Sequence, residues 1–348
     1  MEYPYQRIIA EFQDRQQNVG LAVAVLSEGC FVFADVFGWA DREAEVRATL
    51  ETPFGIASVT KAFTGAALLK LYEEGRIDLD AEIQRYIPEF PLHPAASVTL
   101  RQLAAHLAGI RHWGPERNAD LNARHFDDLF DILPLFRDNA FAVVPGTQYL
   151  YSSYGYNLLA MAIQRAAGIP FQQYVAQAIL HPLQLQKTGF DRPGLAGRER
   201  PARYSWYDLT DYHPLDTAPV RVPDWDYSHN MAGGNMAATV GDLARFGRAF
   251  RPSGLLSDTS IALLWRRPVL AGIESPMSFG WFLRDDPPRL SISGSNAGLQ
   301  AGMTVWRDQD LVVVALANSW GIGSQSGEFM DDSPQGLLGK LAAVSRTE

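Results

Sequence analysis

Short, strongly apolar runs near both ends of the chain predict β-strands. Residues 19–25 and 30–37 are two such runs, and the turn Ser27-Glu28-Gly29 between them predicts a hairpin. Four more runs follow late in the chain, at residues 279–285, 289–293, 302–306 and 311–318, with a tight hairpin turn at 308–310. Strands at both ends of one chain favour a single, mostly antiparallel sheet.

The middle of the chain has helical spacing instead. Helices are predicted at residues 58–75, 99–107, 126–137, 155–168, 171–180 and 239–250, with terminal helices at 2–17 and 334–344. Thr99 is an expected N-cap, Gly168 an expected C-cap, and either Thr239 or Asp242 caps the helix at 239–250. Residues 191–230 lack a clear period and predict a long ordered loop.

These elements predict an α+β fold, in which helices flank a mostly antiparallel sheet and a mainly helical lobe is inserted. The predicted domains are a sheet domain of residues 1–75 and 240–348, and an inserted lobe of residues 76–239. The length of 348 residues favours such a two-part organisation.

One stretch carries candidate chemistry. Ser58 and Lys61 are three residues apart at the start of a predicted helix, so both side chains lie on one face. A backbone N–H at a helix start can stabilise an oxyanion, and a lysine among Ala, Phe and Leu residues is partly desolvated, which lowers its pKa. The pair therefore fits an activated nucleophile with its base.

A simpler interpretation is open at this point. Ser58 or Thr60 can be an ordinary helix N-cap, and Lys61 a solvated first-turn residue. However, a lysine in the first turn opposes the helix dipole.

Tyr151 and Ser153 stand in a second stretch of interest, between the turn Pro145-Gly146 and the helix predicted at 155–168. A tyrosine beside a lysinium has a lowered pKa and can pass a proton to a leaving group, and Ser153 can bind the lysine or the substrate. Without Ser58, an aromatic loop packed under a helix cap would be the preferred interpretation.

The composition argues against several other classes of function. The net charge of −9 argues against a nucleic-acid surface. Cys30 is the single cysteine, which excludes an intrachain disulfide and a cysteine metal site, and we expect it in the core. The histidines lack ligand spacing, so neither a metal nor a cofactor is expected. No leader-peptide pattern and no membrane-spanning run is present, which predicts a cytoplasmic protein unless a leader was removed.

The order of motifs resembles the serine β-lactamase and penicillin-binding-protein superfamily, in its class C β-lactamase-like branch. Ser58-Val59-Thr60-Lys61 and Tyr151-Ser152-Ser153 carry the resemblance, and three landmarks follow the same order: residues 99–110, residues 182–190, and the Gly233-Gly234 segment before the helix at 239–250. Together the matches run from about residue 20 to residue 318.

The resemblance implies an acyl-enzyme mechanism. Ser58 would attack an ester or amide carbonyl, Lys61 and Tyr151 would manage the protons, and the N–H groups of Ser58 and of Ser295 would hold the oxyanion. By the same alignment Ser293-Gly294-Ser295 belongs to the family's third motif. Lys187-Thr188-Gly189 matches the letters of that motif, but it lies in the inserted lobe and is taken as coincidental.

Two positions depart from the family pattern. Ser153 replaces an asparagine, and Ile292 stands where a lysine or histidine is expected. Loss of that cation should weaken recognition of β-lactams and of peptides with a free carboxylate, unless Arg111, His112 or Arg289 supplies a charge. The sequence thus predicts a serine hydrolase of small-molecule esters, amides or peptides, with weak or absent β-lactamase activity. Two alternatives are a catalytically silent ligand-binding or scaffold protein and an acyltransferase.

Overall fold

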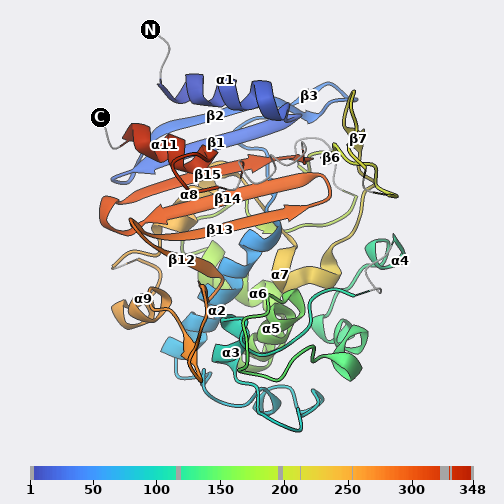
Figure 1. The fold of residues 1–348 in the computed structure, drawn as a ribbon, viewed down its shortest axis with the longest axis vertical. Helices are drawn as coiled ribbons and strands as arrows, with labels where there is room; N and C mark the ends of the chain where they lie inside the picture. Colours follow the sequence, from blue (N-terminus) through green and yellow to red (C-terminus); the bar gives the residue numbers. More distant parts are fainter. Residues whose placement is uncertain are drawn as a thin grey trace.

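The centre of the molecule is an eight-stranded sheet with the strand order β11-β12-β13-β14-β15-β1-β2-β3 (Figure 1). This computed structural model describes residues 4–114, 119–194, 199–211, 213–252, 254–321, 329 and 331–345. The strands of the sheet are β1 (Gly20–Ser27), β2 (Cys30–Asp41), β3 (Val46–Arg47), β11 (Met277–Ser278), β12 (Trp281–Asp285), β13 (Pro288–Asn296), β14 (Leu299–Trp306) and β15 (Leu311–Ala317). All neighbouring strands pair antiparallel. The predicted α+β fold and the predicted sheet from both ends of the chain are confirmed.

The two ends of the chain meet at β1 and β15. Their register runs from Leu21 opposite Ala317 to Ser27 opposite Leu311. Both strands are buried along nearly their whole length. Strands that are covered on both faces are expected to be apolar throughout rather than alternating, which explains the continuous runs in the sequence.

Helices cover both faces of this sheet. The α-helices are α1 (Pro4–Gln16), α2 (Thr60–Glu73), α3 (Leu100–Ala104), α4 (Ala119–Asn122), α5 (Ser153–Ala167), α6 (Phe171–Val175), α7 (Met231–Gly234), α8 (Val240–Arg248), α9 (Asp258–Leu264) and α11 (Leu337–Ser345). Helices α1 and α11 lie side by side on one face (Figure 1) and share a hydrophobic cluster with it. Helices α2 and α8 pack against the other face, within a larger cluster that continues into α5 and α6.

The helix ends follow the predicted caps. Thr99 and Gln102 form a capping box at α3, and the Thr239 side chain, rather than Asp242, caps α8 by accepting from the Asp242 N–H. Gly168 ends α5 in the left-handed conformation, with φ of 69°. These local signals are strong because each one satisfies a backbone group that a helix end leaves unpaired.

Three short sheets and several short turns complete the connections. β4 (Phe54–Gly55), β8 (Met236–Ala238) and β5 (Gly189–Phe190) form one sheet, β16 (Ser319–Trp320), β6 (Tyr204–Ser205) and β7 (Val220–Arg221) a second, and β9 (Val269–Leu270) with β10 (Ile273–Glu274) a third. The 3₁₀ turn η1 (Ala57–Val59) joins β4 to α2. Within 191–230, the described residues form β6, β7 and the 3₁₀ turn η7 (Ser228–Asn230) in a mostly irregular segment.

Three sequence predictions need correction. Residues 126–137 are not one helix but 3₁₀ turns, Leu129–Asp131 and Leu133–Leu135, followed by Arg137–Asn139. Pro134 lacks a backbone N–H and clashes with a preceding α-turn, so a continuous helix cannot form. The helix at 171–180 is α only to Val175, and Ala176–Leu180 is a π-helix. Cys30 is exposed rather than buried, because it begins β2 directly after the hairpin turn.

Helix α2 is fixed against the sheet by a close backbone approach. A Cβ atom added to Gly65 would lie 1.9 Å from the carbonyl oxygen of Phe279, between β11 and β12. No side chain fits in that space, so the glycine sets how closely α2 approaches the sheet.

The large hydrophobic cluster holds residues of both predicted domains, and the division at residues 75/76 and 239/240 stays a prediction.

None of the described helices has the length and apolar character needed to cross a membrane.

We expect Gly65→Ala to destabilise the protein by roughly 1–3 kcal/mol, since the added methyl group overlaps backbone and outweighs the better helix propensity of alanine. Urea unfolding measures the change in the free energy of unfolding. Gly189→Ala is the control, because nothing lies within 4 Å of its added Cβ atom. Equal stability of Gly65→Ala and the parent protein would contradict the close approach.

Candidate active site

Ser58 lies in the η1 turn, with a partly exposed side chain just before α2. The N-cap position of α2 is Val59, and it makes no side-chain cap. Thr60 Oγ1 instead accepts from the backbone N–H of Met236 (3.1 Å). The interpretation of Ser58 or Thr60 as an ordinary N-cap is therefore wrong.

Lys61 is fully buried, so the alternative interpretation of a solvated first-turn lysine is also wrong. Its Nζ donates to the carbonyl oxygen of Gly233 at 2.6 Å, to Ser153 Oγ at 3.1 Å and to Ser58 Oγ at 3.4 Å. Burial lowers the pKa of Lys61 from 10.5 to about 7, because the charged amine is desolvated. A lysine with this pKa is substantially neutral near pH 7 and can accept a proton.

Tyr151 also contacts Ser58 Oγ. Its hydroxyl donates to that oxygen at 2.9 Å, and its ring centroid is 4.8 Å from Lys61 Nζ. Burial raises the pKa of Tyr151, and the hydrogen bond with Ser58 only partly opposes this effect. The expectation of a lowered tyrosine pKa is wrong, because desolvation of the buried phenol outweighs the nearby amine.

Strand β13 passes directly beside the η1 turn. A Cβ atom on Gly294 would lie 2.3 Å from the carbonyl oxygen of Ile56 and 2.6 Å from the N atom of Ser58. Ser293 is partly exposed and Ser295 is exposed. The structure thus brings the predicted third motif to the backbone of Ser58, and only glycine allows this distance.

Ile292 points into the core and not toward solvent. It is 1% exposed and belongs to the hydrophobic cluster between the sheet and α2. A lysine at this position would lose its hydration, so the aliphatic side chain fits its surroundings.

The three candidate compensating groups each have a hydrogen-bond partner in the protein. Arg289 Nε donates to Asp332 Oδ2 (2.9 Å). Arg111 Nε donates to the carbonyl oxygen of Asn139 (3.1 Å), and His112 Nδ1 accepts from the N–H of Ser153 (3.1 Å). None of these contacts points to a cation offered to a substrate carboxylate.

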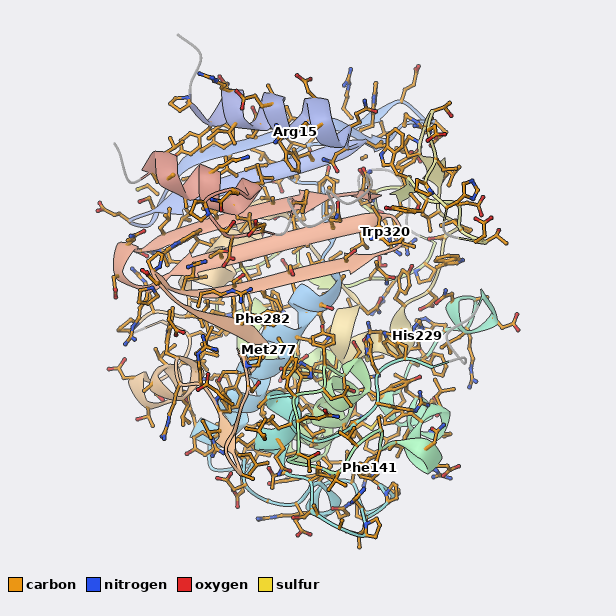
Figure 2. All side chains as sticks on the ribbon, viewed as in Figure 1. Arg15, Phe141, His229, Met277, Phe282 and Trp320 are labelled. Atoms are coloured by element: carbon orange, nitrogen blue, oxygen red, sulfur yellow. The ribbon has the colours of Figure 1, made fainter. Side chains whose placement is uncertain are left out.

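Sequence reasoning missed how the 229–236 segment holds the lysine. Asn157 on α5 donates through Nδ2 to the carbonyl oxygen of His229 (2.9 Å) and accepts from the N–H of Ala232 (3.3 Å). Thr64 Oγ1 on α2 donates to the Ala232 carbonyl oxygen (2.8 Å). His229 and Met277, labelled in Figure 2, both lie below β13 in that view. The only sequence signal for the Gly233 carbonyl was the Gly-Gly pair, because a backbone acceptor has no side-chain signature.

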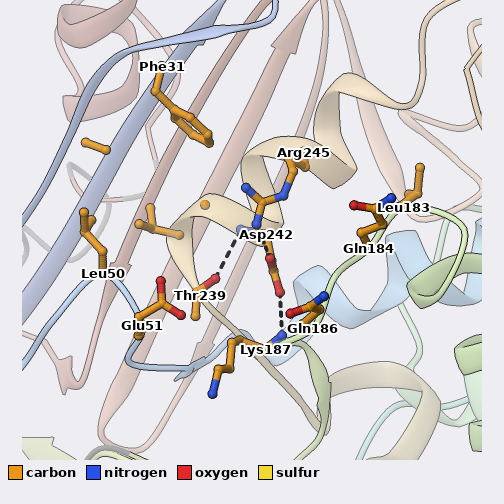
Figure 3. Close-up of a pocket in the computed structure, with 13 residues that line it drawn as sticks. Phe31, Leu50, Glu51, Leu183, Gln184, Gln186, Lys187, Thr239, Asp242 and Arg245 are labelled. Carbon is orange, nitrogen blue, oxygen red and sulfur yellow. Dashed lines mark hydrogen bonds and ion pairs between the residues drawn. The ribbon is translucent and has the colours of Figure 1, made fainter.

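Lys187-Thr188-Gly189 belongs to a different part of the surface. The Lys187 N–H and Thr188 Oγ1 both donate to Asp242 Oδ2, at 2.8 and 3.0 Å. Lys187 and Asp242 line a cavity of about 570 Å³ between β2 and the start of α8 (Figure 3). Ser58, Lys61 and Tyr151 are not among its lining residues.

The sequence pattern also did not indicate one surface group of residues that could bind a metal ion. Asp208, Asp211 and His213 bring ligand atoms within 4.8 Å of one another. His213 Nδ1 lies 2.5 Å from Asp211 Oδ1, so a direct ion pair accounts for part of the group.

Comparisons with known proteins agree with this arrangement. The model of the Beta-lactamase family matches residues 5–328. The chain is 29% identical to the human serine beta-lactamase-like protein LACTB, mitochondrial, covering 70% of this chain and 55% of that protein. It is 30% identical to Protein flp of Staphylococcus aureus strain MW2, covering 86% of this chain and 59% of that protein. The chain thus spans little more than half the length of these curated relatives.

One solved structure shows how far the fold likeness extends. The D-amino acid amidase from Ochrobactrum anthropi superposes with a TM-score of 0.82 at 20% identity, and the match covers 100% of this chain and 99% of the amidase. At this identity the likeness is one of fold.

Stability should rise with pH because of Lys61. Its pKa is about 7 in the folded protein and 10.5 when exposed, so between these values the unfolded chain binds more protons. The free energy of unfolding should therefore rise by roughly 1 kcal/mol per pH unit from pH 7 to 9, relative to Lys61→Met, which lacks the titrating amine. Urea unfolding at each pH measures the difference between the two proteins.

Lys70→Met is the control for this series, because Lys70 pairs with Glu73 and is partly exposed. Its stability should follow that of the parent protein at every pH. Parallel pH profiles for the parent protein and Lys61→Met would show that Lys61 keeps an ordinary pKa.

Proposed function

Because this chain belongs to the Beta-lactamase family, as its motif order predicted, we propose that it is a serine hydrolase that forms an acyl-enzyme on Ser58. One observation carries the proposal. Ser58 Oγ is hydrogen-bonded both to the fully buried amine of Lys61 (3.4 Å) and to the hydroxyl of Tyr151 (2.9 Å). A nucleophile within reach of a base and an acid is the arrangement that acyl transfer requires.

In the proposed first step, neutral Lys61 accepts the proton of Ser58 Oγ while that oxygen bonds to the substrate carbonyl carbon. The negative charge moves to the carbonyl oxygen, where the N–H groups of Ser58 and Ser295 receive it. The approach of Gly294 to the Ser58 N atom supports this pair of donors, since it brings β13 to the same point.

In the second step, the bond to the leaving group breaks and the leaving oxygen or nitrogen takes a proton from Tyr151. Its raised pKa makes the hydroxyl an acid rather than a preformed tyrosinate base. The proton that Lys61 gained then restores Tyr151. Ser153, which accepts from Lys61 Nζ, orients the amine through both steps.

The proposed substrates are uncharged esters and amides. Ile292 supplies no cation, and Arg289 is paired with Asp332 in a buried ion pair. A substrate carboxylate would therefore lack a partner at this wall of the site. Release of the acyl group to water gives a hydrolase, and release to another acceptor gives an acyltransferase through the same intermediate.

A fluorophosphonate should form one covalent adduct on Ser58, because a hydroxyl activated by Lys61 attacks phosphorus as it would a carbonyl carbon. Intact-protein and peptide mass spectrometry measure the adduct. Ser58→Ala should carry none and should lose about 10³-fold or more of kcat/KM on a p-nitrophenyl ester. Absence of both adduct and turnover in the unaltered protein would support the silent scaffold instead.

We expect p-nitrophenyl butyrate to be a better substrate than nitrocefin, by about 10²-fold or more in kcat/KM, because the β-lactam carboxylate meets no cation. Parallel assays at one pH measure the ratio, with Ser58→Ala as the background for each substrate. Comparable turnover of the two compounds would refute the assignment of uncharged substrates.

A further inference from the structure

The loop that carries Tyr151 is bound along its length to residues 106–112. The Leu150 N–H donates to the carbonyl oxygen of His106 (2.8 Å), and the Ser152 N–H donates to His106 Nδ1 (3.0 Å). The Ser153 N–H donates to His112 Nδ1 (3.1 Å). His106 thus binds the backbone N–H groups of Leu150 and Ser152, the two neighbours of Tyr151. His112 binds the N–H group of Ser153, the next residue along the chain.

Both imidazole rings also contact the tyrosine itself. The His106 ring centroid is 4.5 Å from that of Tyr151, and the His112 ring meets it edge-on at 5.5 Å. These contacts limit the ring position while the backbone bonds limit the loop. The Tyr151 hydroxyl that donates to Ser58 is therefore held from two directions.

The start of α5 explains why two acceptors are needed at this point. The first N–H groups of a helix have no partner within the helix. Ser152 Oγ accepts from the Gly155 N–H (2.9 Å), and the two imidazoles accept from Ser152 and Ser153. The helix that begins with Ser153 is thereby fixed with its first side chain 3.1 Å from Lys61 Nζ.

His106 has a backbone conformation that favours glycine. Its φ is +57°, in the left-handed region, and its side chain is 2% exposed. A non-glycine residue in this region carries conformational strain. An imidazole at such a position fits a side chain whose contacts are needed.

The hydrogen bonds also define the form of each ring. An Nδ1 atom that accepts an N–H carries no proton, so each neutral ring bears its proton on Nε2. For His106, burial holds the pKa well below its ordinary value, which keeps the ring neutral.

We propose that His106 and His112 are positioning residues, which accept the N–H groups of Ser152 and Ser153 and so place Tyr151 Oη on Ser58 and Ser153 Oγ on Lys61. This inference rests on the proposed function. It assigns a role to two histidines that take no part in the proposed proton transfers. Their absence should slow the chemical step and leave substrate binding nearly unchanged.

The test compares His112→Leu and His106→Leu with His112→Asn and His106→Asn, because the asparagine oxygen can take the place of Nδ1. The leucine variants should lose about 10- to 100-fold in kcat on a p-nitrophenyl ester, with KM within about twofold, since a small displacement of a catalytic group has that effect. The asparagine variants should recover most of the loss. Thermal unfolding identifies any variant that fails to fold.

His93→Leu is the matched control. His93 Nδ1 also accepts a backbone N–H, from Ala95 (3.1 Å), but its ring packs on Phe141 instead of Tyr151. Its kcat should stay at the parental value. A kcat equal to that of the parent protein in both leucine variants overturns the inference.

A second measurement needs no turnover. Long-range ¹H–¹⁵N spectra of the unaltered protein at pH 7.5 should include the signals of His106 and His112 as rings protonated only on Nε2. One of these two signals should disappear in His106→Asn and the other in His112→Asn. Protonation of Nδ1 in either ring overturns the inference. Failure of the unaltered protein to label at Ser58 would overturn the proposed function and the positioning role with it. Normal labelling with unchanged leucine variants would overturn the positioning role alone.

Discussion

The burial of one amine is the constraint on which the rest of the site depends. Lys61 has no exposed surface, and its strongest contact is to a backbone carbonyl oxygen, that of Gly233. A charged ammonium in such a place is costly, so the site favours the neutral amine. The surrounding helices hold that amine where the Ser58 hydroxyl can use it. Burial of this amine lowers the stability of the molecule and supplies the base that the proposed mechanism needs.

Three separate segments keep this amine in place. Helix α2 carries it, α5 supplies Ser153, and the 229–236 segment supplies the accepting carbonyl oxygen. Asn157 binds the 229–236 segment to α5, and Thr64 binds the same segment to α2. β13 closes the site from the sheet, where Gly294 meets the Ser58 backbone. The position of the Lys61 amine therefore depends on the packing of the helices against the sheet.

The sequence predicted the strands, the cap residues and the helix that follows Ser58, because each depends on short-range patterns such as apolar runs or the Thr99 and Gly168 caps. It was wrong where the outcome depends on surroundings. The raised pKa of Tyr151 follows from burial, and the exposure of Cys30 from its place at a hairpin turn. The roles proposed for Gly233 and His106 depend on backbone atoms brought together from distant segments, which no spacing rule encodes.

The pairing of β1 with β15 has a consequence for when the site can exist. Leu21 pairs with Ala317, and β13, which carries Gly294, is linked to β1 through β14 and β15. A chain emerging from the ribosome therefore presents Ser58, Lys61 and Tyr151 long before the strand that closes the site has been made. Contacts this distant in sequence form late and slowly. The nascent chain thus carries these three residues before the strand with Gly294 exists, and assembly of the candidate site waits for the late strands of the sheet.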